Sequence, residues 1–174
     1  LISVTGTWMQ TVALSWLVYR LTGSTLLLGT VGFASQIPIL LVAPLGGMMA
    51  DRHDRQRIVI GTQTASMVLA FLLAALTFTG KVQVWHILVL ATLLGVANAF
   101  DIPARHAFLV DMVGKEDLMN AIALNSTMFN GARIVGPAVA GILVAMIGEG
   151  WCFFANAMSY IAVIVGLMLM RVRR

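Results

Sequence analysis

Six long apolar segments follow one another along the chain, separated by short polar stretches. A bilayer span needs about 20 predominantly apolar residues, and each segment comes close to that length or exceeds it. The pattern predicts an all-α membrane protein with six transmembrane helices. Pro103 is expected to bend or interrupt the fourth helix near its end. The predicted helices cover residues 1–19, 26–50, 58–79, 85–110, 118–147 and 151–170.

The composition supports the same interpretation. Hydrophobic residues make up 60% of the chain and charged residues 10%, whereas a soluble domain carries roughly 25% charged residues. With so few charges, most of the surface has to meet lipid or other helices. The six segments use nearly the whole chain, and its first residue, Leu1, already lies in an apolar run. We therefore expect a fragment whose first helix is truncated.

Basic residues are distributed unequally between the two sides of the predicted bundle. Alternate connections share a side of the membrane, so one side holds only Arg20 and Lys81. The other side holds eight basic residues: Arg52, Arg55, Arg57, Arg105, Lys115, Arg171, Arg173 and Arg174. Short loops rich in Lys and Arg face the cytoplasm, so both ends of the chain are expected there. These bases lie in short tracts without interleaved aromatic residues, which argues against nucleic-acid binding.

Side chains that catalyse reactions or bind metals are few and scattered. Cys152 stands alone, so the chain offers no disulfide framework and no cysteine metal site. The three histidines lie near predicted helix ends, and no H-E-x-x-H pattern occurs. A membrane-embedded enzyme would need a nucleophile–base pair or metal ligands at membrane depth. We therefore expect no enzyme, no metal site and no cofactor.

Polar residues inside the predicted helices recur at helical spacing. Residues four apart stay on one face of an α-helix, so such a stripe either lines a watery path or makes hydrogen bonds to other helices. For the larger amides Gln10, Gln36 and Asn130 we favour a place in the cavity. The first helix carries a stripe of four hydroxyls: Ser3, Thr7, Thr11 and Ser15.

Three charged residues within the helices are candidates for binding or coupling. Arg133 lies well inside the fifth helix, where a charge costs several kcal/mol unless it faces water or a partner. We favour a role in binding an anionic group or a mobile carboxylate; the alternative is snorkelling towards the interface. Asp101 and Arg105 are four residues apart, a spacing that allows an ion pair. That pair acts in function only if one member lies in a closing interface.

The densest motif follows the second helix, at residues 46–57, where small residues precede an acid and several bases. It resembles the loop signature of the major facilitator superfamily, G-x-x-x-D-R-x-G-R-R/K. Asp54 stands where the signature has glycine, and Gln56 stands where a base is common. Four residues match the signature: Gly47, Asp51, Arg52 and Arg55.

Further segments extend the resemblance over nearly the whole chain. Residues 98–107, 120–125 and 130–141 are similar to helices four and five of bacterial exporters of the enterobactin-exporter and macrolide-efflux branch. Such proteins have twelve helices in two six-helix halves around a central site. The resemblance implies that this chain is the N-terminal half, that the C-terminal half is missing, and that it lies in the bacterial inner membrane. Gly136, Pro137 and Gly141 resemble part of the helix-five antiporter signature.

The resemblance also implies a function. It indicates alternating-access export of drug-like or siderophore-like small molecules, with Asp51, Arg52 and Arg55 as a cytoplasmic latch against the second half. Proton coupling follows from the resemblance alone, because Ala91 stands near the usual helix-four arginine and the first helix has no carboxylate. The residues themselves leave one alternative open: a six-helix channel or a membrane unit that dimerises.

Overall fold

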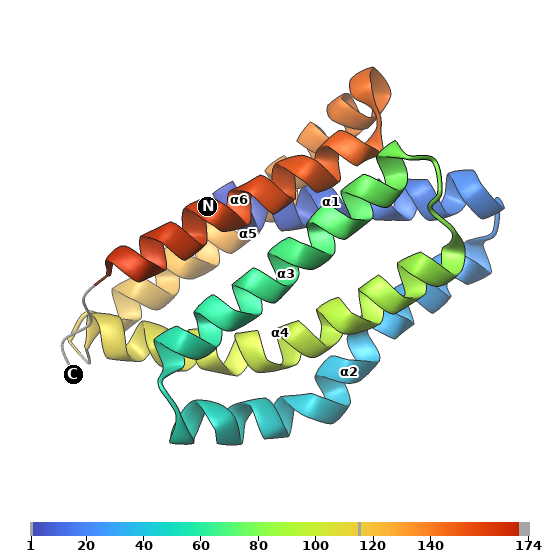
Figure 1. The fold of residues 1–174 in the computed structure, drawn as a ribbon. Helices are drawn as coiled ribbons and strands as arrows, with labels where there is room; N and C mark the ends of the chain where they lie inside the picture. The colour runs from blue at the N-terminus through green and yellow to red at the C-terminus, as the bar shows by residue number, and fades with distance from the viewer. Residues whose placement is uncertain (1, 115, 171–174) are drawn as a thin grey trace.

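The computed structural model describes residues 2–114 and 116–170, and this part of the chain is all-helical (Figure 1). Short connections join six helices, as the hydropathy pattern predicts. Their bounds are α1 Ile2–Thr22, α2 Thr25–Arg52, α3 Arg55–Phe78, α4 Val84–Val113, α5 Leu118–Ile147 and α6 Glu149–Leu169.

Side chains at the helix ends explain where the bounds differ from the sequence prediction. The Ser24 hydroxyl accepts a hydrogen bond from the Leu27 N–H at 3.4 Å, so α2 begins at Thr25. The Asp54 carboxylate accepts from the backbone N–H groups of Gln56 and Arg57, and α3 begins three residues earlier than expected. Both are N-caps, in which a side-chain oxygen satisfies N–H groups of the first turn.

Pro103 does not interrupt α4, which continues for ten residues beyond it to Val113. The expectation that this proline interrupts the fourth helix is therefore wrong. Proline removes one backbone hydrogen bond, and packed neighbouring helices make that loss tolerable in a membrane bundle. The chain leaves α4 at Gly114, whose φ of 77° lies in the region that favours glycine.

Within the described residues, five helices, α2 to α6, are long and apolar enough to cross a membrane. The first helix does not reach that apolarity, because its hydroxyl stripe and Gln10 lie among its 21 residues. Its length of 21 residues corresponds to roughly 30 Å at 1.5 Å per residue, which matches the bilayer core. The six-helix expectation therefore holds for the fold, and five of the six described helices also meet the apolarity expected of a membrane span.

The helices pack in an unequal pattern. α2 packs along α4, α3 packs against α4 and α6, and α1 packs against α5 and α6. Among these five helices, α2 and α5 bury the smallest share of their 18-residue apolar stretch, 11% and 17%, compared with 33–39% for α3, α4 and α6. These two helices therefore leave broad apolar faces without a partner in the six-helix unit.

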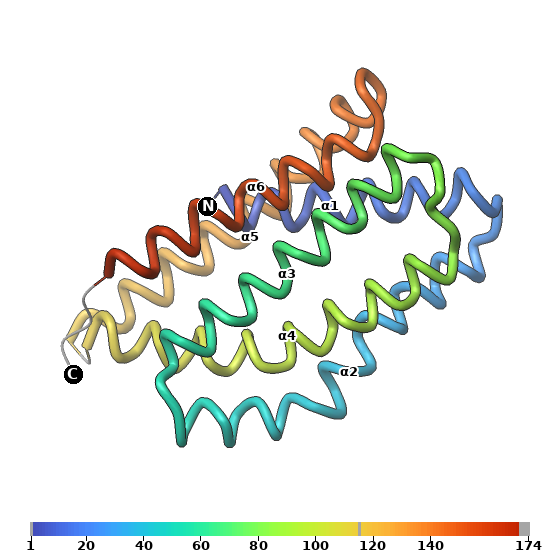
Figure 2. The backbone as a smooth tube through the Cα atoms, viewed as in Figure 1, coloured from blue at the N-terminus to red at the C-terminus, as the bar shows by residue number. Residues whose placement is uncertain are grey.

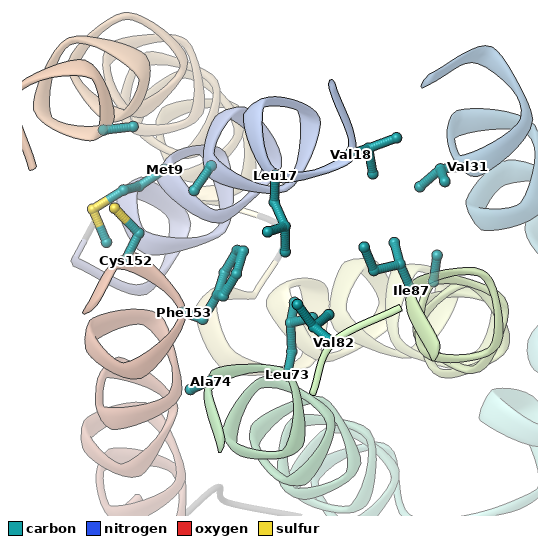
Figure 3. Packing of buried hydrophobic residues seen from close by; sticks show 13 residues of the cluster. Met9, Leu17, Val18, Val31, Leu73, Ala74, Val82, Ile87, Cys152 and Phe153 are labelled. Carbon is teal, nitrogen blue, oxygen red and sulfur yellow. The ribbon is translucent and has the colours of Figure 1, made fainter. Parts of the chain in front are cut away.

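The main apolar core joins α1, α3, α4 and α6. Leu17, Ile87, Leu73 and Phe153 are each no more than 3% exposed, and their side chains meet between the helices (Figure 3). A second cluster around Phe108 lies among α2, α3, α4 and α6. Burial of this kind fixes the helices of the unit relative to one another.

Two glycines allow α2 and α4 to approach closely. A Cβ atom at Gly46 would overlap the carbonyl oxygen of Ala99, and one at Gly95 would overlap that of Ser35. Small residues at such crossings bring helix backbones into contact in membrane proteins. α2 also changes direction in its second half, where Pro38 and Pro44 lie (Figure 2).

The two ends of the bundle differ in charge. The α2–α3 and α4–α5 connections lie at one end, together with the end of α6, and the other three connections lie at the opposite end (Figure 1). The first end has the motif bases, whereas Arg20 and Lys81 belong to the second. Four bases predicted for the first end, Lys115, Arg171, Arg173 and Arg174, lie outside the described residues.

Candidate functional site

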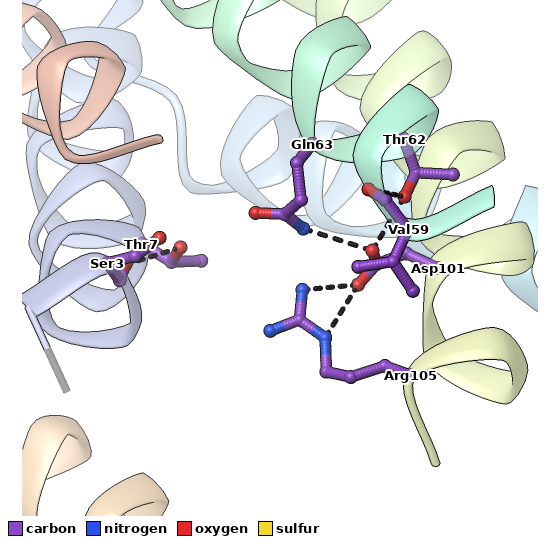
Figure 4. Close-up of polar contacts among 7 residues, drawn as sticks. All are labelled: Ser3, Thr7, Val59, Thr62, Gln63, Asp101 and Arg105. Carbon is purple, nitrogen blue, oxygen red and sulfur yellow. Dashed lines mark hydrogen bonds and ion pairs between the residues drawn. The ribbon is translucent and has the colours of Figure 1, made fainter. Parts of the chain in front are cut away.

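A buried carboxylate joins α3 to α4 (Figure 4). Asp101, on α4, is 4% exposed. It accepts hydrogen bonds from the Thr62 hydroxyl at 2.6 Å and from the Gln63 amide at 3.0 Å, both on α3. Its second oxygen accepts from Nε and Nη2 of Arg105 at 3.0 and 2.5 Å. The ion pair that the four-residue spacing allowed is thus formed, and Pro103 between its members leaves it intact.

The surroundings of this pair are asymmetric. The carboxylate is enclosed by donors, whereas the Arg105 side chain is 47% exposed. A buried charge is tolerated when opposite charge and hydrogen bonds compensate it. Within this unit the buried Asp101 carboxylate therefore links α3 to α4, while the Arg105 guanidinium remains partly exposed.

The motif loop is anchored by one of its arginines. Arg55 donates from Nε to the Ala50 carbonyl at 3.2 Å and from Nη1 to the Ala107 carbonyl at 3.4 Å. The same Nη1 lies 2.7 Å from a carboxylate oxygen of Asp111 on α4. Arg55 therefore ties the loop between α2 and α3 to the end of α4.

The other predicted latch residues remain free in the described part of the chain. Asp51 and Arg52 are exposed and make no side-chain hydrogen bond or ion pair there. A Cβ atom at Gly47 would meet nothing within 4 Å, in contrast to its neighbour Gly46. The matching residues thus divide into an internal anchor, Arg55, and an outward group of Gly47, Asp51 and Arg52.

Two motif positions that depart from the signature have local roles that the sequence analysis missed. Asp54 caps α3, as described above. The Gln56 amide donates to the carbonyl oxygens of Leu167 at 2.5 Å and Met170 at 3.1 Å, which close the end of α6. An acid directly before a predicted helix is a readable N-cap signal, whereas the reach of Gln56 to α6 depends on tertiary packing.

Gln10 lies in a buried polar contact between α1 and α6. Its side-chain oxygen accepts a hydrogen bond from the Asn156 amide at 2.7 Å, and Asn156 is fully buried. Gln10 also borders a cavity of about 20 Å³ with Ile87 and Ala91, a volume that fits one water molecule. Within the described unit Gln10 thus joins two helices beside a water-sized space. Asn156, inside the last apolar run, was a polar signal that the sequence analysis did not use.

The hydroxyl stripe of α1 bonds to its own helix. The hydroxyls of Thr7, Thr11 and Ser15 donate to the carbonyl oxygens of Ser3, Thr7 and Thr11, each at 3.0 Å. All three hydroxyl residues are exposed. Within the described residues these hydroxyls therefore face outward from the bundle and do not join α1 to another helix.

Arg133 is the sixteenth of the 30 residues of α5 and is exposed. Its guanidinium carbon lies 5.5 Å from the ring centroid of Trp8 on α1, within range of a cation–π contact. Trp8 in turn meets Phe129 edge-on, with ring centroids 5.9 Å apart. In the described part of the chain Arg133 makes no side-chain hydrogen bond or ion pair.

The remaining cavity and bend candidates lie on the two least buried helices. Gln36 is exposed on α2, and Asn130 is exposed on α5, where its amide donates to the Ser126 carbonyl at 2.9 Å. Three residues form the predicted bend of α5, which is continuous through them. A Cβ atom at Gly136 would lie 2.6 Å from the Trp8 Cβ, whereas Gly141 has open space. The bend residues are Gly136, Pro137 and Gly141.

Six membrane-length helices, with an acid- and arginine-bearing loop after the second, are the architecture of one half of a major facilitator transporter. The family described as transmembrane secretion effector matches residues 1–174. The chain therefore belongs to this family of the major facilitator superfamily, and it corresponds to the N-terminal half of such a transporter. It is a multi-pass membrane protein of a bacterial transporter family.

Curated relatives agree with this assignment. The chain is 32% identical to the staphyloferrin A transporter of Staphylococcus aureus, over 94% of this chain and 42% of that protein. It is 27% identical to macrolide efflux protein A of Streptococcus pyogenes, over 72% of this chain and 31% of that protein. It is 26% identical to the multidrug efflux pump Tap of Mycolicibacterium fortuitum, over 95% and 42%. The chain spans less than half the length of these relatives, and no solved structure matches it.

Proposed function

We propose that this chain, joined to a second six-helix half, exports small amphipathic molecules by alternating access. The observation that carries the proposal is the family match over the whole chain, together with relatives named for siderophore transport and drug efflux. The unpartnered apolar faces of α2 and α5 support a second half beside them. The outward hydroxyls of α1 and the exposed Arg133 of α5 supply polar groups for a cavity between the halves. The proposal assigns no catalytic residue.

We place the protein in the bacterial inner membrane, with the motif end of the bundle in the cytoplasm. Short loops rich in arginine stay on the cytoplasmic side, and the described motif loop carries three arginines, Arg52, Arg55 and Arg57. Trp85 and Trp151 lie at the opposite end. The Trp151 ring packs edge-on against the ring of Phe78. Tryptophan is enriched at membrane interfaces, which supports this placement of the bundle across the bilayer.

Coupling to protons is proposed from the family alone. Two acids of the described residues are buried, Asp101 and Glu149, and each is already paired with an arginine, Arg105 and Arg20 respectively. Because both acids are already paired, we do not propose either of them as the proton carrier.

Export is tested with the full-length protein in cells. Cells that express it are loaded with a fluorescent amphipathic dye or a macrolide, and accumulation is measured with and without an uncoupler. We expect accumulation to fall on expression and to recover when the uncoupler is added. Accumulation that rises with expression would show uptake. Transport by the six-helix chain alone would instead favour the channel or dimer alternative.

The latch is tested by Asp51→Asn in the full-length protein. Because Asp51 has no partner in the described unit, we expect its charge to act between the halves. Loss of a charge-assisted hydrogen bond of about 1.5 kcal/mol or more should change the ratio of inward-open to outward-open protein about tenfold. Distances between spin labels on the cytoplasmic ends of the two halves measure that ratio. Asp117→Asn, which changes an exposed acid of the α4–α5 connection, is the matched control, and an unchanged ratio in Asp51→Asn rejects the latch.

A further inference from the structure

Arg133 carries a charge that no hydrogen bond or ion pair neutralises among residues 2–114 and 116–170. Its side chain lies at the middle of a transmembrane helix, about 22 Å from either helix end at 1.5 Å per residue. An arginine at that depth costs several kcal/mol unless water or an anion meets it. The hydrocarbon core is about 30 Å thick, so the middle of a spanning helix lies about 15 Å from the headgroups. The arginine stem is shorter than this distance, so snorkelling does not relieve the charge.

The aromatic neighbours hold Arg133 without neutralising it. A cation–π contact contributes roughly 0.5–2 kcal/mol, and the Trp8 ring offers no acceptor for the N–H groups of a guanidinium. A guanidinium is planar and directs its donors in that plane. An arginine covered by a ring therefore keeps its edge available for an anion.

The backbone fixes this arrangement. Gly136, three residues after Arg133, lets α5 approach α1 so closely that a Cβ there would lie 2.6 Å from the Cβ of Trp8. Trp8 is thus wedged beside α5, and Phe129, one turn before Arg133, meets it at an interplanar angle of 77°. Phe129 is 50% exposed, so an apolar aromatic wall lies next to the charged group.

We propose that Arg133, Trp8 and Phe129 form a substrate subsite that selects amphipathic anions, with the anionic group on the guanidinium and the aromatic or apolar part against the rings. This inference rests on the proposed transport function, whose substrate class it narrows. Bidentate recognition of a carboxylate or sulfonate suits the open edge of a guanidinium. The other possible occupant, an acidic side chain of the second half, is an outcome of the test below.

The test uses two dyes that differ in one charged group. Full-length protein in lipid nanodiscs is titrated with 1-anilinonaphthalene-8-sulfonate, an anion, and with N-phenyl-1-naphthylamine, its neutral counterpart, and protein-free nanodiscs are subtracted. We expect Arg133→Gln to weaken saturable binding of the anion about tenfold or more and to leave binding of the neutral dye unchanged. Trp8→Leu should weaken binding of both dyes. Lys81→Gln, which removes a base from an exposed turn, should change neither.

Several binding results would overturn the subsite. Equal anion binding by the wild type and Arg133→Gln overturns the subsite and indicates that Arg133 pairs with an acid of the second half; wild-type protein without saturable anion binding also overturns it. If Arg133→Gln loses the neutral dye too, through misfolding, Arg133→Lys decides. This variant keeps the charge without the planar fork, so anion binding should weaken about threefold, and unchanged binding overturns the proposal.

Failure of the subsite can be told apart from failure of the transport proposal. If cells with the wild-type protein export the neutral dye but the protein does not bind the anion, the transport proposal stands and the subsite proposal fails. If the protein binds the anion saturably through Arg133 but cells export neither dye, the subsite proposal stands and the export proposal fails.

Discussion

Gly46→Ala is expected to destabilise the protein by about 3 kcal/mol, the upper end of the usual effect of overpacking. The added methyl group would overlap the Ala99 carbonyl oxygen of α4. Because that atom belongs to the backbone, no side-chain rotation relieves the overlap, and α2 has to move away from α4. The free energy of unfolding of the full-length protein in mixed micelles measures the effect.

A matched glycine on the same helix gives the opposite expectation. Gly29 lies on α2, where a Cβ atom would meet nothing within 4 Å. Alanine is preferred over glycine in a helix by about 1 kcal/mol, so Gly29→Ala should be neutral or stabilising. Equal effects of the two substitutions would contradict the close approach of α2 and α4 at Gly46.

Asp101→Ala is expected to lower the free energy of unfolding by about 3 kcal/mol. The substitution leaves Thr62, Gln63 and Arg105 without their shared acceptor, and breaking a buried ion pair costs about 3–5 kcal/mol. The lower end applies because Arg105 is half exposed and regains water. Chemical denaturation in mixed micelles gives the value.

The control for this prediction is the second ion pair of α4. Asp111 pairs with Arg55 at 2.7 Å, but its side chain is 43% exposed. Exposed pairs contribute about 0–1 kcal/mol, so Asp111→Ala should change stability by less than about 1 kcal/mol. If Asp101→Ala lowers the free energy of unfolding no more than Asp111→Ala does, Asp101 does not stabilise the contact between α3 and α4.

The helices themselves were predictable because apolar length is a local property of the sequence. Their ends were less so, since Asp54, which departs from the family signature, is the cap that starts α3. Whether Pro103 interrupts α4 depends on the neighbours that compensate for its missing N–H, and these come from other helices.

The candidate site was predictable where it depends on one helix and not where it depends on two. The Asp101–Arg105 pair follows from a spacing of four residues. The donors from Thr62 and Gln63 depend on how α3 is set against α4, which no local pattern specifies. For the same reason no local pattern shows that Gln10 accepts a hydrogen bond from Asn156 beside a space for one water. The functional roles of Gln10, Gln36, Asn130 and Arg133 remain predictions.

If the hydroxyls of α1 line the proposed transport cavity, they bear on the breadth of substrates. The hydroxyls of Thr7, Thr11 and Ser15 each donate their one hydrogen bond to a carbonyl oxygen of their own helix. An apolar molecule beside them therefore leaves no hydroxyl donor without an acceptor. Under the proposed transport function, we therefore expect this surface to accept apolar and polar molecules almost equally. We then expect discrimination among these molecules to come from the few polar groups that lack a hydrogen-bond partner within their own helix.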